Sequence, residues 1–239
     1  SCVDMTDEMK EKKEVTLVPL RLRIGGKEVV DDGTYGKVQE IHSGNTVSGQ
    51  VGSSCPSPDD YLSRVSPEAE RIYLVTGSSK LTGSFASATV AAQIMQESAE
   101  RKKKLIVIDS GTASAGQTFL ILKIMQWEKK QREFSWICKK IRKLTRQIET
   151  EFVLEDLAVL QKTGRIPAWK TKIAGSLHIC PVLRASHGEI VSCGQARGIK
   201  KALALLEKRI TQSMSADGED MVVISHCGCP ERAFALKMA

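Results

Sequence analysis

The sequence has few aromatic residues, and its charge is unbalanced. Phe, Trp and Tyr make up 5% of the 239 residues, so few side chains are present on which nucleic-acid bases could stack. Lys and Arg number 35 against 28 Asp and Glu, a formal charge of +7, and they gather on predicted helix faces without aromatic residues between them. The excess therefore favours an anionic ligand or an acidic protein partner over nucleic acid.

The chain has no long apolar run and no disulfide pattern. No stretch approaches the roughly twenty apolar residues of a membrane span, and no signal peptide opens the sequence. The seven cysteines are odd in number and scattered, which is typical of reduced thiols in a cytosolic protein. Cys227 and Cys229 lie beside His226, but no second cluster would complete a tetrahedral metal site. We therefore expect a soluble, cytoplasmic protein without a bound metal.

The stretch from Arg71 to Ser110 has the pattern of a strand, a hydroxyl-rich loop, a helix and a second strand. The helix pattern is carried by Ala86, Val90 and Ile94, with Ala91 and Met95 beside them. Such a unit is a right-handed crossover between parallel strands, which places the loop Thr76 to Ser84 at the carboxyl edge of the sheet. A helix N-terminus at this edge can hold an anion.

Small donors and one cation crowd this loop, which suits a carboxylate or phosphate better than a hydrophobic ligand. They are Ser78, Ser79, Lys80, Thr82, Gly83 and Ser84. The alternative is that these are N-cap and turn residues that bind no ligand.

A second stretch, V-G-S-S-C-P-S-P-D-D-Y-L from Val51 to Leu62, is predicted to be a stiff loop that enters a helix. Two prolines restrict its backbone, and Ser57 or Asp59 can cap the helix. Ser53 and Ser54 again supply hydroxyl groups. As a plain turn, the stretch needs no ligand.

Near Thr150 the pattern changes and a new α/β run begins, so we predict two domains, residues 1–149 and 150–239. The second half is predicted to contain a T-G-R-I-P turn, a hairpin joined at His187 and Gly188, an amphipathic helix from Gly198 to Met214 and a strand at 221–224.

No nucleophile with an activating base is evident in the sequence. The chain has no G-x-S-x-G elbow, its four histidines lack a triad context, and T-G-S-S-K-L-T-G-S lacks the order of a P-loop. Three alternatives stay open: a binding protein, a small-molecule hydrolase that uses Ser79 or Ser84, and a regulatory binding protein for another amphipathic anion.

Taken together, the motifs resemble the DegV family of bacterial lipid-binding proteins, and the resemblance covers nearly the whole chain. The motifs that carry it are S-C-V-D-M, V-P-L-R-L-R-I-G-G-K-E, S-S-C-P-S, S-S-K-L-T-G-S, V-I-D-S, L-Q-K-T-G-R-I, G-S-L-H-I-C-P-V-L and R-G-I-K-K-A. The resemblance implies two α/β domains, the first with a largely parallel, Rossmann-like sheet, and a long-chain fatty acid between the domains. It implies no catalysis and no cofactor, because a separate fatty acid kinase phosphorylates the bound acid.

The resemblance also implies a head-group site. The carboxylate-binding Thr of the family falls on Ser53, and a second hydroxyl of the family falls on Thr82; Ser54, Ser79 and Gly83 lie nearby in the two loops. Each exchange keeps a hydroxyl that can donate to a carboxylate. Basic positions that face the kinase in the family match Arg165 and Arg197. The head-group histidine of the family lies beyond Ala239, and its role does not transfer to His226.

Further expectations concern the tunnel and the ends of the chain. We expect Ile173, Leu177 and Ile179 to line an apolar tunnel, and we expect a strand before Ser1 and several tens of residues after Ala239.

Overall fold

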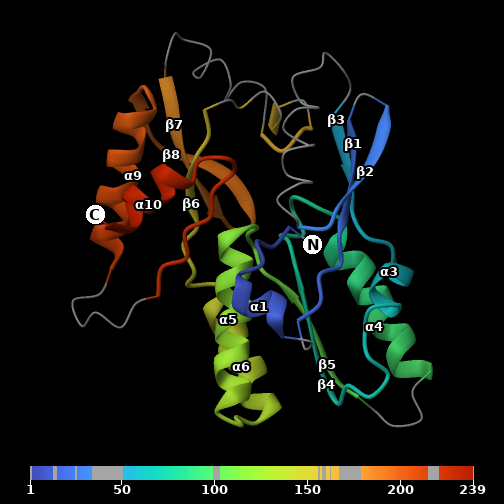
Figure 1. Ribbon diagram of the computed structural model, residues 1–239. Helices are drawn as coiled ribbons and strands as arrows, with labels where there is room; N and C mark the ends of the chain where they lie inside the picture. Colours follow the sequence, from blue (N-terminus) through green and yellow to red (C-terminus); the bar gives the residue numbers. More distant parts are fainter. Residues whose placement is uncertain are drawn as a thin grey trace. The chain divides into compact units, whose positions relative to one another are not determined.

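The computed structural model describes residues 2–12, 15–24, 26–33, 51–98, 103–155, 157, 160–161, 163–166, 179–214 and 221–238 (Figure 1). Backbone contacts divide the chain into two compact units, Ser1–Ile148 and Glu149–Ala239. The predicted tunnel residues Ile173 and Leu177 lie outside the described residues.

The first unit contains the predicted crossover. Strand β4 (Arg71–Thr76) pairs in parallel with β5 (Lys104–Asp109), with Thr76 opposite Asp109, and helix α4 (Ser84–Ser98) connects them. Alternate residues of both strands face opposite sides, as strand geometry requires. One face packs on α4 and the other on α5 (Ala115–Lys129) and α6 (Phe134–Leu144). The parallel sheet is thus covered on both faces, which confirms the predicted α/β class.

The buried side of α4 is not the side that carries its large β-branched residues, Val90 and Ile94. Ala88 and Ala91 are fully buried, whereas Val90 and Ile94 are 43% and 39% exposed. Small side chains allow the helix to lie close to β4, so packing distance, rather than hydrophobicity, decides which side is buried.

A three-stranded antiparallel sheet, ordered β2-β1-β3, accompanies the crossover. Strands β1 (Leu20–Ile24) and β2 (Lys27–Asp31) form a hairpin, and β3 (Val51–Ser54) pairs with the other edge of β1. Ser53 and Ser54 therefore lie on a strand, and the prediction that they belong to a loop was wrong. The short helices α1 (Asp7–Glu11) and α3 (Pro58–Leu62) are capped by Thr6 and Ser57.

The second unit is built on an antiparallel sheet of β6 (Glu151–Val153), β7 (Ile179–Ser186) and β8 (Glu189–Arg197). The turn between β7 and β8 has φ of 50° at His187 and 84° at Gly188, the left-handed pair that a two-residue hairpin needs. Helix α9 (Ile199–Ser213) packs on this sheet through Ala202 and Leu206, and α10 (Pro230–Met238) ends the unit. Residues 221–224 have no regular structure, so the strand predicted there is absent.

Within the described ranges, no helix is both long and apolar enough to cross a membrane.

Candidate functional site

The site begins at the carboxyl edge of β4 and β5, where three hydrogen bonds join the segments that follow the two strands. The Ser78 amide donates to the Thr112 carbonyl at 2.8 Å, and the Ser110 amide donates to the Thr76 carbonyl at 3.3 Å. The Ser79 amide donates to Asp109 Oδ1 at 3.1 Å. The segment 77–84 is therefore held against the end of β5, at the edge where open α/β sheets bind ligands.

Thr82 is oriented by contacts on both sides of its Cβ. A Cβ placed on Gly77 would lie 3.1 Å from Thr82 Cγ2, so the methyl group packs on bare glycine backbone. On the other side, Thr82 Oγ1 accepts from the Ser84 amide at 3.2 Å and lies 2.9 Å from Ser84 Oγ. If Ser84 donates its hydroxyl proton to Thr82, the Thr82 proton is left to donate to a ligand.

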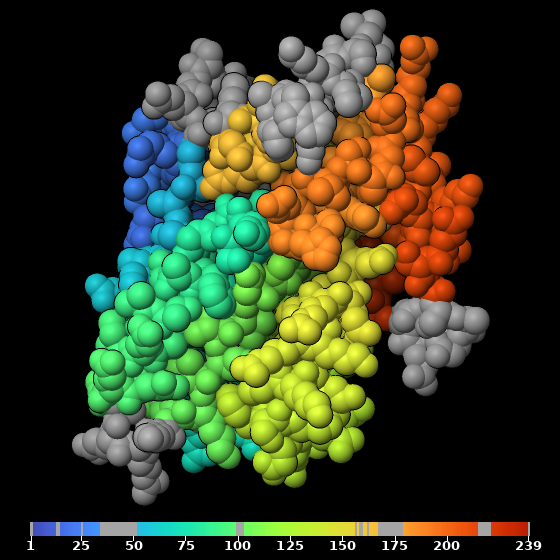
Figure 2. All heavy atoms as spheres, turned by 180° about the vertical axis from the view of Figure 1, so that it is seen from behind, coloured from blue at the N-terminus to red at the C-terminus, as the bar shows by residue number. Residues whose placement is uncertain are grey.

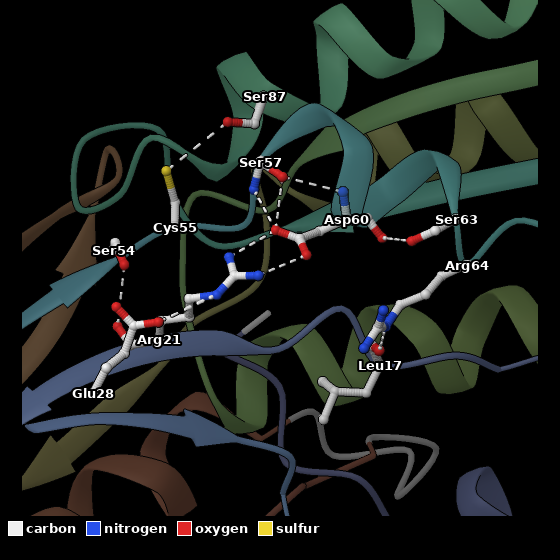
Figure 3. Close-up of polar contacts among 10 residues, drawn as sticks. All are labelled: Leu17, Arg21, Glu28, Ser54, Cys55, Ser57, Asp60, Ser63, Arg64 and Ser87. Carbon is white, nitrogen blue, oxygen red and sulfur yellow. Dashed lines mark hydrogen bonds and ion pairs between the residues drawn. The ribbon is translucent and has the colours of Figure 1, made fainter.

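The segment between β3 and α3 is fixed by a network centred on Asp60 (Figure 3). Asp60 Oδ2 accepts from the Ser57 amide and hydroxyl, both at 2.8 Å, and the Ser57 hydroxyl accepts from the Asp60 amide at 3.2 Å. Arg21 donates two further bonds to the Asp60 carboxylate, at 2.8 and 2.9 Å. These bonds, Arg21 first, hold the pKa of the Asp60 carboxyl well below its usual range.

Cys55 joins this segment to the start of α4. Its Sγ lies 3.9 Å from Ser87 Oγ (Figure 3). A Cβ placed on Gly83 would lie 2.9 Å from the same sulfur. The structure thus brings together the two hydroxyl-bearing segments that the sequence singled out. Ser53 and Ser54 are exposed on β3, and Ser54 Oγ is 3.5 Å from the Arg21 carbonyl.

We expect Gly83→Ala to destabilise the first unit by about 1–3 kcal/mol, because the added methyl overlaps Cys55 Sγ and overpacking has this cost. Gly52→Ala is the matched control, since nothing lies within 4 Å of a Cβ at that position. Urea denaturation measures both. Combining Gly83→Ala with Cys55→Ala should recover most of the loss; a double variant no more stable than Gly83→Ala alone would contradict the contact.

Sequence reasoning identified Ser53, Ser57, Thr82 and the hydroxyl loop, but it missed Arg21 and Asp60. The pair is separated by 39 residues in sequence. The only local signal was the S-P-D-D run, which predicts a capped helix but does not identify the arginine that reaches its carboxylate.

The predicted partner residues lie in the second unit. Arg165 is half-buried and donates from Nη1 to the Thr163 carbonyl at 2.6 Å, whereas Arg197 is exposed at the end of β8. His226 is also exposed. The predicted tunnel residue Ile179 is half-buried at the start of β7.

One strongly basic segment covers residues 129–146, from the end of α5 to just past α6. This segment has eight Lys and Arg residues and one Glu, a charge of +7 equal to that of the whole chain. The eight are Lys129, Lys130, Arg132, Lys139, Lys140, Arg142, Lys143 and Arg146. Figure 2 shows the segment, yellow-green to yellow, at the surface. A groove of about 720 Å³ along α6 is lined by four of these cations.

All seven cysteines are free thiols. Among the residues that the structure describes, no group of three or more His, Cys, Asp or Glu is placed to hold a metal ion.

The first unit is a parallel crossover whose carboxyl edge is lined with hydroxyl groups. Cys55 packs this edge against the segment that follows the serine-bearing strand β3. These features define an α/β ligand-binding protein. The chain belongs to the DegV family, because the family model described as "Uncharacterised protein, DegV family" matches residues 1–239. A DegV domain-containing protein of Streptococcus gordonii is 29% identical over 229 residues, which are 92% of this chain and 79% of that protein.

Two solved structures are similar over most of the chain. A DegV family protein from Ruminococcus gnavus, refined with vaccenic acid, has a TM-score of 0.90 and 32% identity, covering 100% of this chain and 85% of that one. The Fatty Acid Kinase (Fak) B3 protein of Streptococcus pneumoniae, loaded with linoleic acid, has a TM-score of 0.76 and 29% identity. That match covers 82% of this chain and 69% of that one.

Proposed function

We propose that the protein binds a long-chain fatty acid and presents its carboxylate to a fatty acid kinase, without catalysing a reaction itself. The observation that carries the proposal is the similarity along the full chain to the Ruminococcus gnavus protein that was refined with vaccenic acid. The joined hydroxyl segments at the carboxyl edge supply a site of suitable chemistry. The cytoplasmic location expected from the thiols stays a prediction.

In this proposal the head group is held by Ser53 and Thr82, with Ser54, Ser79 and Gly83 nearby. Each hydroxyl donates one hydrogen bond to a carboxylate oxygen, and such charge-assisted bonds are stronger than neutral ones. With Ser84 as the donor of the hydroxyl pair, in which the two oxygens are 2.9 Å apart, the Thr82 proton is left for the carboxylate.

The acyl tail supplies most of the affinity, and the head-group hydroxyls supply orientation. Burying sixteen to eighteen carbons at about 0.8 kcal/mol per methylene contributes about 12 kcal/mol before entropy costs. Two hydroxyl bonds to a carboxylate that stays near water contribute only about 1 kcal/mol together, because water takes their place when they are lost.

The serines considered as nucleophiles fit this role better than catalysis. Ser84 is fully buried and lies against Thr82. Ser79 is exposed, and its amide is bonded to a carboxylate. Neither contact supplies the general base that a serine nucleophile needs.

Denaturing the purified protein, extracting it and analysing the extract by negative-ion mass spectrometry tests the proposal. We expect about one equivalent of a C14 to C18 fatty acid, and the spectrum identifies the chain that the protein selects. Protein that yields no lipid and takes up no added fatty acid would overturn the proposal and favour an enzyme or another anionic ligand.

The kinase is proposed to contact Arg165 and Arg197. We expect the double substitution to alanine to raise the concentration of loaded carrier that half-saturates the kinase by about tenfold, because rim charges guide and orient association. Arg142→Ala with Arg146→Ala removes the same charge from α6 and the turn that follows it, and it should leave this concentration within twofold of wild type. A larger effect of the α6 pair would place the kinase on α6 instead.

A further inference from the structure

The groove along α6 is formed by two neighbouring rows of side chains on one face of that helix and of the turn after it. Successive members of each row are four positions apart. The rows are Phe134, Cys138, Arg142 and Arg146, and Ser135, Lys139, Lys143 and Gln147. Rows with this spacing are the ridges of a helix surface, and the groove between two ridges is where a ridge of another helix packs. The shape of the groove therefore suits a partner helix.

The two ends of the groove differ in chemistry. Its neutral end is formed by Phe134, Ser135 and Cys138, of which the phenyl ring and the thiol are half-buried. Its basic end is formed by four exposed cations, Lys139, Arg142, Lys143 and Arg146. None of the residues that line the groove is acidic. A helix that packs here must therefore present apolar side chains at one end and carboxylates at the other.

The four cations of the basic end repel one another. Lys139 and Lys143 are four positions apart, as are Arg142 and Arg146, a spacing at which like charges destabilise a helix. Among the described residues, none of the four has an ion-pair partner. The helix dipole favours cations in the last turn, but its effect does not extend to Lys139 one turn earlier. Carboxylates of a partner would remove this repulsion.

Two other anionic partners suit this face less well. A lipid bilayer is bound by apolar side chains that enter it, but within residues 129–147, all of which the structure describes, no large apolar side chain is exposed. Single-stranded nucleic acid stacks its bases on aromatic rings. Here Arg132 Cζ and Lys140 Nζ already lie over the Trp136 ring, each 5.3 Å from its centre.

We propose that the α6 groove binds a helix of an acidic protein partner, with apolar side chains against the neutral end and carboxylates against the basic end. The charges orient the approach of the partner, and the apolar contacts set its position along α6. The kinase is proposed to contact Arg165 and Arg197, so the partner on α6 is a second protein. The inference does not depend on the bound lipid.

A synthetic peptide of about sixteen residues, long enough to span the groove as a helix, tests the proposal. It carries Leu in the first half of one face and Glu in the second half, and a peptide of the same composition in scrambled order is its control. We expect fluorescence anisotropy to show binding at least about tenfold tighter for the ordered peptide.

Two pairs of substitutions test where the peptide binds. Arg142→Ala with Arg146→Ala should weaken binding of the ordered peptide by about tenfold, because it removes half of the basic end. Lys129→Ala with Lys130→Ala removes the same charge from exposed positions at the end of α5, outside the groove, and is the matched control. This pair should keep the affinity within about twofold of wild type.

Equal affinity for the two peptides, or an equal loss from the two pairs of substitutions, would show attraction by net charge alone and would overturn the inference. Tighter binding of phosphatidylglycerol vesicles, or of a single-stranded oligonucleotide as long as the peptide, would also overturn it by assigning the surface to another occupant. None of these results would bear on the proposed function, which the lipid extraction tests separately.

Discussion

Replacing both Ser53 and Thr82 by alanine is expected to lower kinase-dependent phosphorylation of bound fatty acid about a hundredfold, while affinity for the fatty acid falls less than tenfold. The tail supplies most of the binding free energy, so loss of the hydroxyl bonds weakens uptake only modestly. Phosphoryl transfer, in contrast, depends on holding the attacking carboxylate oxygen in place, and a misplacement of about 1 Å can cost a hundredfold.

Fluorescent fatty-acid displacement measures uptake, and acyl phosphate formed with a bacterial fatty acid kinase measures presentation. Thr211→Ala with Ser213→Ala removes the same two hydroxyl types from exposed positions of α9 and is the matched control. Phosphorylation at the wild-type rate in the Ser53 and Thr82 double variant would show that these residues do not hold the carboxylate. An equal loss of uptake and phosphorylation would assign them to affinity instead.

The crossover could be predicted from the sequence because its signals are local. The apolar runs of β4 and β5, the hydroxyl-rich turn and the helical spacing between them lie within 40 consecutive positions, and handedness rules then fix the parallel pairing. The hairpin of β7 and β8 was predicted for the same reason, from a short turn between two strand-like runs. Its left-handed turn residues confirm that reasoning.

Strand β3 could not be predicted, because it owes its conformation to pairing at long range. V-G-S-S has little strand propensity, and it is extended because β1, some thirty residues earlier, offers an open edge. At residues 221–224 the error was the opposite, because a strand was predicted and is absent. M-V-V-I has strong strand propensity, but the segment has no regular structure. Propensity without a partner strand does not make a sheet.

The candidate site was predictable only in part. Composition alone identifies the hydroxyl-rich segments. The environments of Arg21, Cys55 and Gln117, in contrast, depend on spatial neighbours that the sequence does not reveal. Gln117 in particular occupies a position of α5 that elsewhere in the same buried stripe is Leu or Ile. Its side-chain amide has no hydrogen-bond partner among the described residues, which only the structure shows.

Asp60→Ala is expected to lower the free energy of unfolding at pH 7 by about 2 kcal/mol, because it removes the reciprocal cap with Ser57 and leaves that helix end unsatisfied. The loss should depend on pH. The pKa of Asp60 is lowered in the folded state, first by the Arg21 hydrogen bonds, so its stabilisation is complete above the unfolded pKa of about 3.9. It is lost as the pH falls from there toward the folded pKa.

The difference in unfolding free energy between wild type and Asp60→Ala should therefore be constant from pH 7 to about 5 and shrink below pH 4. Asp59→Ala is the matched control, because Asp59 is an exposed acidic neighbour in the same first turn of α3. Urea titrations between pH 2.5 and 7 measure all three proteins. A difference that is unchanged at pH 3, or equal to that of Asp59→Ala, would contradict the stabilising role of the Asp60 carboxylate. If that role holds, Asp60→Ala should also impair presentation of the bound acid, because the cap anchors the segment that follows Ser53 on β3.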